Sequence, residues 1–195
     1  MSTPTPRAEP QTRFFENSQQ WETWLANNFE LQEGVFLKFA KKNSGITSLN
    51  HSGALDVALC YGWIDGQARS LDETYYLQKF TPRRPKSTWS KINIEKVTAL
   101  IAAGKMQPAG QAAIDAAKAD GRWAAAYESQ AKATVPDDFA AALAQNPAAQ
   151  QFFDSLTKAN KYAFLWRLMT AKTPEKRQEK LHTFVEMLAA GKAFH

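Results

Sequence analysis

The hydrophobic pattern of the first 130 residues predicts a small sheet with helices packed on it. A helix is expected from about residue 18, where Ser18 can serve as the N-cap and Trp21 and Trp24 fall on one face. The run 35–40 is rich in β-favouring residues and lies between a glycine and a polar turn, so it is expected to form a buried strand.

The following residues alternate between helical and extended patterns. The segment 51–61 has its apolar residues at helical spacing and stops at Gly62, which readily adopts the left-handed conformation of a helix end. Segments 63–69 and 74–81 have the composition of two strands joined by a polar turn. Two further helices are expected before residue 122.

The last third of the chain shows an all-helical pattern. Helix starts are expected near Thr134, at Asn146 and at Thr173, each with a proline close to the first turn. The expected core of this unit is apolar and comprises Phe139, Leu143, Phe152, Phe153, Leu156, Phe164, Leu165, Leu168, Leu181, Phe184 and Leu188. The pattern therefore predicts a small three-helix unit.

Together these elements predict an α+β fold. Residues 1–16 are expected to form a disordered tail, because prolines and small polar residues dominate the stretch and little apolar area can be buried. Residues 17–130 are expected to form a small, mainly antiparallel sheet flanked by helices, and residues 131–195 the C-terminal three-helix unit.

Composition limits the classes of protein that need to be considered. With 195 residues, 44% of them hydrophobic, the chain can bury one good core or two small ones. No apolar run reaches the roughly 18 to 20 residues that span a bilayer, and the N-terminal residues are too polar for a signal peptide. The predicted localisation is cytoplasmic.

Neither the cysteine nor the histidines predict a metal or a cofactor. Cys60 is the only cysteine, which excludes an internal disulfide, and its position on the last turn of a predicted helix favours packing over reactivity. The histidines at 51, 182 and 195 lack metal-ligand spacing. His51 has no acidic partner at a telling spacing, so a role at a helix start or on the surface is expected.

Positive charge is concentrated in one segment, which we call the basic run and define as residues 79–91. Its five lysines and arginines are accompanied by no acid, and they equal the net charge of +5 of the whole chain. Arg83 and Arg84 can bind phosphate or carboxylate with two hydrogen bonds each, and Trp89 offers a flat apolar surface. Pro82 and Pro85 indicate a rigid loop, which suits a preorganised pocket.

Asp65 lies in the predicted strand 63–69, where a buried carboxylate needs a cation or several donors. It could orient Arg83 or Arg84 or act as a base, and it could equally be a turn residue that stabilises the hairpin. The turn with Lys42 and Ser44 resembles an anion-binding turn but lacks the full pattern of a phosphate-binding loop. The predicted ligand-binding residues are Lys42, Ser44, Asp65, Arg83, Arg84, Trp89 and Lys91.

Several segments resemble one family of bacterial proteins. They are GVFLKFAKK at 34–42, ALCYGWIDGQ at 58–67, KFTPRRPKSTWSKIN at 79–93 and GKMQPAG at 104–110. They resemble the YdeI/OmpD-associated, or bacteriocin-protection (OmdA-like), family most densely over residues 20–127. The resemblance continues through 171–191, which is similar to that family's C-terminal helical module.

The resemblance implies a link to envelope stress, to bacteriocin resistance and to an outer-membrane porin, and members of the family have been predicted to be periplasmic. It implies no catalytic residues. The sequence NHSG at 50–53 departs from the expected pattern, where an aromatic residue and acidic residues would stand.

Three functions remain open from the sequence. The first is binding of a small anionic ligand, bearing phosphate or carboxylate, in a pocket built from the residues named above, with or without a reaction. The second is nucleic-acid binding through the basic run. The third is a protein-interaction module that uses the C-terminal helices.

Overall fold

The structure is a computed structural model that describes residues 10–194 of the chain. Within it the chain forms two compact units, which are described separately. The first comprises residues up to 87 together with Asn93–Ala124, and the second comprises Thr88–Ile92 together with residues from Ala125 onward.

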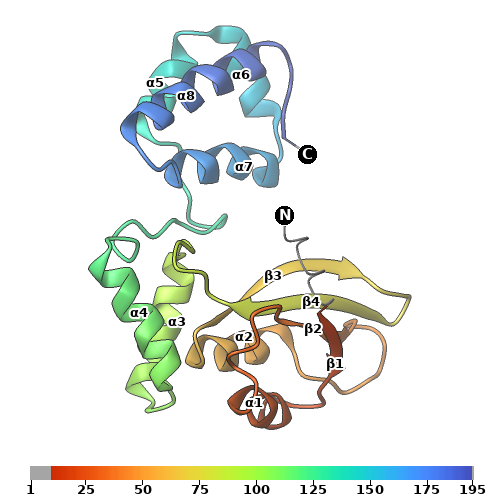
Figure 1. The fold of residues 1–195 in the computed structure, drawn as a ribbon. Helices are drawn as coiled ribbons and strands as arrows, with labels where there is room; N and C mark the ends of the chain where they lie inside the picture. Colours follow the sequence, from red (N-terminus) through yellow and green to blue (C-terminus); the bar gives the residue numbers. More distant parts are fainter. Residues whose placement is uncertain (1–9, 195) are drawn as a thin grey trace, which may run out of the picture. The chain divides into compact units, whose positions relative to one another are not determined.

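The first unit is built on a mixed four-stranded sheet with the order β1-β2-β4-β3 (Figure 1). Its strands are β1 (Gln11–Phe14), β2 (Val35–Ala40), β3 (Trp63–Ser70) and β4 (Tyr75–Pro82). β4 pairs antiparallel with both β2 and β3, whereas β1 runs parallel to β2. An α+β fold is confirmed, and the mainly antiparallel sheet has one parallel pair.

The strand β1 lies in the segment that was expected to be a disordered tail, so that prediction is wrong for residues 11–14. All four of its residues are exposed, and its order comes from ladder hydrogen bonds to the edge of β2. A strand that buries no side chain carries no apolar signal in the sequence. Residues 1–9 of the predicted tail lie outside the described residues.

Two helices cover one face of this sheet (Figure 1). They are α1 (Ser18–Ala26) and α2 (His51–Cys60). The N-cap of α1 is Asn17, not Ser18, because the Asn17 side chain accepts a hydrogen bond from the Gln20 amide. Trp21 is fully buried, and its indole N–H donates to the Ala54 carbonyl of α2 at 3.1 Å. This bond and the buried aromatic ring hold the two helices together.

Two more helices, α3 (Lys91–Ala102) and α4 (Pro108–Ala119), follow the sheet in the chain. The start of α4 packs closely against the end of α2. A Cβ atom placed on Gly110 would lie 2.8 Å from the carbonyl carbon of Cys60, so only glycine fits at this contact.

A β-bulge interrupts β3. Asp65 pairs with Phe80 and Ala68 with Gln78, so three steps along β3 correspond to two along β4. The side chain of Gln78, which is buried, donates to the Gly66 carbonyl at 2.5 Å and so satisfies the irregular backbone. Because of the extra residue, Asp65 and Arg69 lie on opposite faces of the sheet.

In the part of the chain that the structure describes, the second unit has four helices rather than the predicted three. They are α5 (Asp137–Ala144), α6 (Pro147–Ser155), α7 (Lys158–Met169) and α8 (Pro174–Ala189). The helix start that was not predicted is at Thr157, which caps α7. Its side chain accepts a hydrogen bond from the Asn160 amide, and the preceding residue, Leu156, has an extended backbone that separates α6 from α7.

The core of this unit agrees closely with the expected one. Nine predicted residues are buried, Phe152 and Leu156 are partly buried, and Ala149 is added. The buried set is Phe139, Leu143, Ala149, Phe153, Phe164, Leu165, Leu168, Leu181, Phe184 and Leu188.

Across residues 10–194, none of the helices combines the length and the apolar character that a membrane span requires.

Candidate functional site

The residues predicted to bind a ligand are distributed over both units. Lys42 and Ser44 lie in the turn after β2, and Asp65 lies on β3. Arg83 and Arg84 follow the end of β4 within the first unit, whereas Trp89 and Lys91 belong to the second unit.

The two residues of the second unit are already engaged in packing and pairing. Trp89 is only 2% exposed, and its carbonyl accepts a hydrogen bond from the Tyr127 amide at 3.0 Å. The ammonium of Lys91 lies 2.7 Å from a carboxylate oxygen of Glu128. These contacts give both residues a structural role in the second unit.

Backbone hydrogen bonds order the loop that carries the two arginines. The Arg83 amide donates to the Gly62 carbonyl at 2.9 Å, and the Arg84 amide donates to the Ser87 hydroxyl at 3.0 Å. The guanidinium of Arg122 donates to the Ser87 carbonyl at 2.9 Å. The side chain of Arg84 is exposed at this fixed turn.

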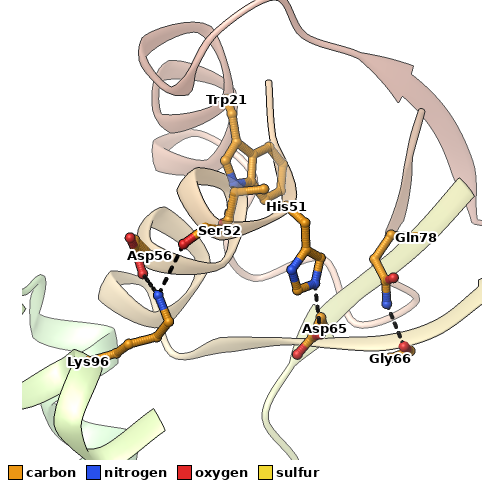
Figure 2. A network of polar contacts seen from close by, with 9 residues as sticks. Trp21, His51, Ser52, Asp56, Asp65, Gly66, Gln78 and Lys96 are labelled. Carbon is orange, nitrogen blue, oxygen red and sulfur yellow. Dashed lines mark hydrogen bonds and ion pairs between the residues drawn. The ribbon is translucent and has the colours of Figure 1, made fainter. Parts of the chain in front are cut away.

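The structure pairs Asp65 with His51 (Figure 2). The distance between His51 Nε2 and Asp65 Oδ2 is 3.0 Å, and 40% and 28% of the two side chains are exposed. The ring of His51 also lies beside Phe39 and Phe80, with centroid distances of 6.4 and 6.3 Å. The prediction that His51 lacks an acidic partner is therefore wrong.

This pairing fixes how the imidazole can act. Because a carboxylate only accepts hydrogen bonds, Nε2 carries the proton in the pair. In the neutral ring Nδ1 then has a lone pair and can accept a proton, whereas in the charged ring Nδ1 is a second donor. Asp65 orients the ring in both forms, as carboxylates do in histidine-based sites.

His51 lines a cavity of about 390 Å³ at the start of α2. The polar side chains around it come from the segment between β2 and α2, from the first residue of α2, and from β4. They are Lys41, Lys42, Ser48, Asn50, His51 and Tyr76. Of the predicted ligand-binding residues, this cavity has Lys42 in its wall and Asp65 directly behind its histidine.

Positive charge and a hydrogen-bond donor line part of this cavity. The first turn of α2 presents the positive end of the helix dipole, and the exposed Lys42 adds a full charge. Lys41 is turned elsewhere, because its ammonium donates to the Asp72 carbonyl at 2.6 Å. Burial raises the pKa of Tyr76, so its phenol stays a neutral hydrogen-bond donor at physiological pH.

A separate polar cluster lies on the other side of α2 (Figure 2). The ammonium of Lys96 lies 2.6 Å from Asp56 Oδ1 and 3.3 Å from the Ser52 hydroxyl. This cluster ties α3 to α2 and shares no residue with the His51 pair.

Cys60 is buried, as predicted, and it lines a second cavity of about 530 Å³ together with Glu22 and Asp56. Burial, followed by the negative charges of Glu22 and Asp56, raises the pKa of the thiol to about 11. At neutral pH the thiol is protonated, so it is a poor nucleophile. Within residues 10–194 no group of three metal-ligating side chains comes together, and His195 lies outside that range.

Comparison with known proteins first defines the class of the chain. Residues 13–113, just over half of the sequence, match the family described as domain of unknown function DUF8412, and the chain belongs to that family. Residues 132–191 match the family described as Bacteriocin-protection, YdeI or OmpD-Associated (OmdA). Most of the second unit therefore matches the OmdA family model, and the predicted resemblance is confirmed.

The region of this match differs from the expected one. The resemblance is densest over residues 20–127, whereas the OmdA match covers 132–191 and the DUF8412 match covers 13–113. No curated protein and no solved structure matches the chain.

Proposed function

We propose that this protein serves a stress or bacteriocin-protection role by binding a small anionic ligand in the cavity at the start of α2. The observation that carries the proposal is that Lys42 and His51 line one cavity while Asp65 holds the histidine ring at 3.0 Å. The name of the OmdA family supports the biological context.

A phosphate or carboxylate group has complementary partners in this cavity. Lys42 supplies a full positive charge, and the imidazolium form of His51 supplies a donor through Nδ1 while Nε2 remains bonded to Asp65. The neutral donor Tyr76 lines the same space. The apolar wall formed by Phe39 suits a ligand with a small hydrophobic part.

The cavity volume restricts the ligand to a small molecule. About 390 Å³ lies at the low end of the range for small-molecule sites, and it fits a phosphosugar, a mononucleotide or an organic acid. In this proposal Arg83 and Arg84, which follow the end of β4 opposite to Tyr76, are not part of the cavity wall. Trp89 and Lys91 have structural roles.

A thermal-shift screen with phosphosugars, mononucleotides and organic acids tests the proposal. A ligand at 100 times its Kd stabilises the folded chain by about 2.7 kcal/mol, which is a shift of several degrees in a chain of this size. We expect one of these compounds to raise the melting temperature of the wild type. We expect the shift to be lost in Lys42→Ala and in His51→Gln.

Matched control variants show whether a ligand that shifts the melting temperature binds in the cavity. Lys172→Ala removes the same charge from an exposed position in the second unit and should leave the shift unchanged. If the shift survives in Lys42→Ala and His51→Gln but disappears in Arg83→Ala and Arg84→Ala, the ligand binds the basic run and the cavity is not the site. If no compound shifts the melting temperature, small-anion binding is refuted for these classes.

A further inference from the structure

The face of the sheet opposite α1 and α2 carries a regular set of aromatic and basic side chains. We call it the cationic sheet face and define it as Phe36 and Lys38 of β2, Arg69 of β3, and Tyr75 and Lys79 of β4. We propose that the cationic sheet face binds single-stranded nucleic acid. This surface lies outside the cavity at the start of α2, so the inference is independent of the proposed function.

The strand register places these side chains on one face. Phe36 pairs with Lys79, and Leu77 pairs with both Lys38 and Arg69. Side chains of paired residues point to the same side of a sheet. Val35, Leu37 and Phe39, which alternate with this set, are buried on the other face, where α1 and α2 lie (Figure 1).

Direct contacts confirm that cations and rings share this face. The guanidinium of Arg69 lies 4.5 Å from the centre of the Phe36 ring, and the Lys79 ammonium lies 5.8 Å from the same ring. The Lys38 ammonium lies 3.7 Å from the centre of the Tyr75 ring. These cations lie over the ring faces, so a base that stacks on a ring takes the place of the cation, and the released cation can then bind the phosphate.

The charge of the face is of one sign. Asp65 is the only carboxylate within the four strands, and it lies on the helix-covered face, where it pairs with His51. Phe14 of β1 extends the aromatic set at the edge, because it contacts the Tyr75 ring edge-on at 6.2 Å and is 41% exposed. The surface thus combines three cations with three aromatic rings. An acid, Asp72, lies in the β3–β4 turn, where the Thr74 and Tyr75 amides and then the charge of Lys38 lower its pKa.

These features favour a single strand over other polyanions. Unpaired bases can stack on the rings while the phosphates meet the cations, and stacking tolerates any base sequence. A duplex keeps its bases stacked on each other, so the rings would find no partner. An acidic peptide would use the cations but would leave the rings without a role.

Fluorescence anisotropy with a labelled dT12 oligonucleotide and the full chain tests this inference. Three phosphate contacts predict that log K falls with log salt with a slope of about −2 for a single strand. In the double variant Arg69→Gln/Lys79→Gln the slope should shrink to about −0.7, and binding at 50 mM salt should weaken about ten-fold or more. Phe36→Leu keeps an apolar side chain but removes the ring, and we expect it to weaken binding about five-fold or more.

The controls use the same chain. Lys172→Gln/Lys192→Gln removes two exposed charges from the second unit and should leave both affinity and slope unchanged. Lys42→Ala tests the cavity and should not affect dT12. Circular dichroism melting of each variant separates loss of binding from loss of folding.

Several results would overturn the inference. One is the absence of dT12 binding at 50 mM salt. Another is equal weakening by the second-unit control, which would show binding through net charge alone. A third is displacement of dT12 by poly-glutamate as readily as by unlabelled dT12, which would show a surface for acidic chains. Loss of binding only in Arg83→Ala/Arg84→Ala would assign the oligonucleotide to the basic run instead.

Discussion

Replacing Gly110 by alanine tests how closely the start of α4 packs against the end of α2. Gly110 is buried in the first turn of α4, and a Cβ there would lie 2.5 Å from the sulfur of Met106 and 2.8 Å from the carbonyl carbon of Cys60. Met106 is flexible and can move, but the Cys60 carbonyl is backbone. The end of α2 and the start of α4 therefore have to separate by several tenths of an ångström.

Two contributions of opposite sign determine how much Gly110→Ala changes the free energy of unfolding. Alanine in a helix is favoured over glycine by up to about 1 kcal/mol, because it restricts the unfolded chain. Forcing an extra methyl group into a packed contact costs about 1–3 kcal/mol, and more where backbone has to move. We therefore expect Gly110→Ala to lower the free energy of unfolding of the first unit by about 1–2 kcal/mol.

The matched control is Gly104→Ala. Gly104 has a φ of +67° and nothing within 4 Å of an added Cβ, so only the left-handed backbone opposes the alanine, at about 1 kcal/mol. Because the chain has two compact units, hydrogen exchange measured by mass spectrometry is the suitable assay. In Gly110→Ala, peptides from α2 and α4 should exchange faster, while peptides from α5–α8 should not change.

A Gly110→Ala protein that is as stable as the wild type would refute this reasoning. It would mean that the contact relaxes without cost and that glycine is not needed there. Faster exchange in all peptides would instead show that the two units unfold together.

Three further predictions concern stability. The pKa of Cys60 is raised to about 11 in the folded chain, so above pH 9 unfolding releases its proton and stability should fall by about 2 kcal/mol between pH 9 and 11. Cys60→Ala should show a correspondingly smaller decline in urea titrations, and an equal decline would contradict the assignment. Hydrogen bonds from Arg177, at 2.8 Å to each oxygen, lower the pKa of Asp138, so its contribution is present at neutral pH and is lost as pH falls through the lowered pKa. Asp138→Asn should therefore cost about 0.5–1 kcal/mol at pH 7 and less as the pH falls through the lowered pKa, and a cost that does not change with pH would argue against an ionic origin. Gln78→Leu removes the hydrogen bond to the Gly66 carbonyl and should lower thermal stability by about 1 kcal/mol, whereas an unchanged melting temperature would show that water replaces the side chain.

The elements that were predicted correctly have strong local signals. The strand 35–40 buries every second residue, and α2 follows its asparagine cap and ends before a glycine with a φ of +74°. The hairpin strands were placed within one residue of their observed bounds. In each case the sequence contains both the periodicity and the residue that ends the element.

The missed features depend on contacts that no local pattern encodes. The four exposed residues of β1 are ordered by pairing with β2 and by the contact of Phe14 with Tyr75. The start of α7 at Thr157 was obscured by the apolar residues on both sides of it. The pair His51–Asp65 spans 14 positions of the chain and forms because α2 lies across the sheet. The only available signal was the presence of both residues near the ends of adjacent elements.

The bulge in β3 makes two surfaces depend on one backbone residue. In a regular strand, residues four positions apart share a face, so Asp65 and Arg69 would point the same way. The extra residue between Asp65 and Ala68 instead sends the carboxylate toward α2 and the guanidinium toward Phe36. Deletion of Gln67 would restore the alternation and would remove either the support of His51 or the arginine beside Phe36. A natural relative that lacks one residue at this point can therefore retain only one of the two surfaces, and the length of this strand becomes a marker for divergence of function.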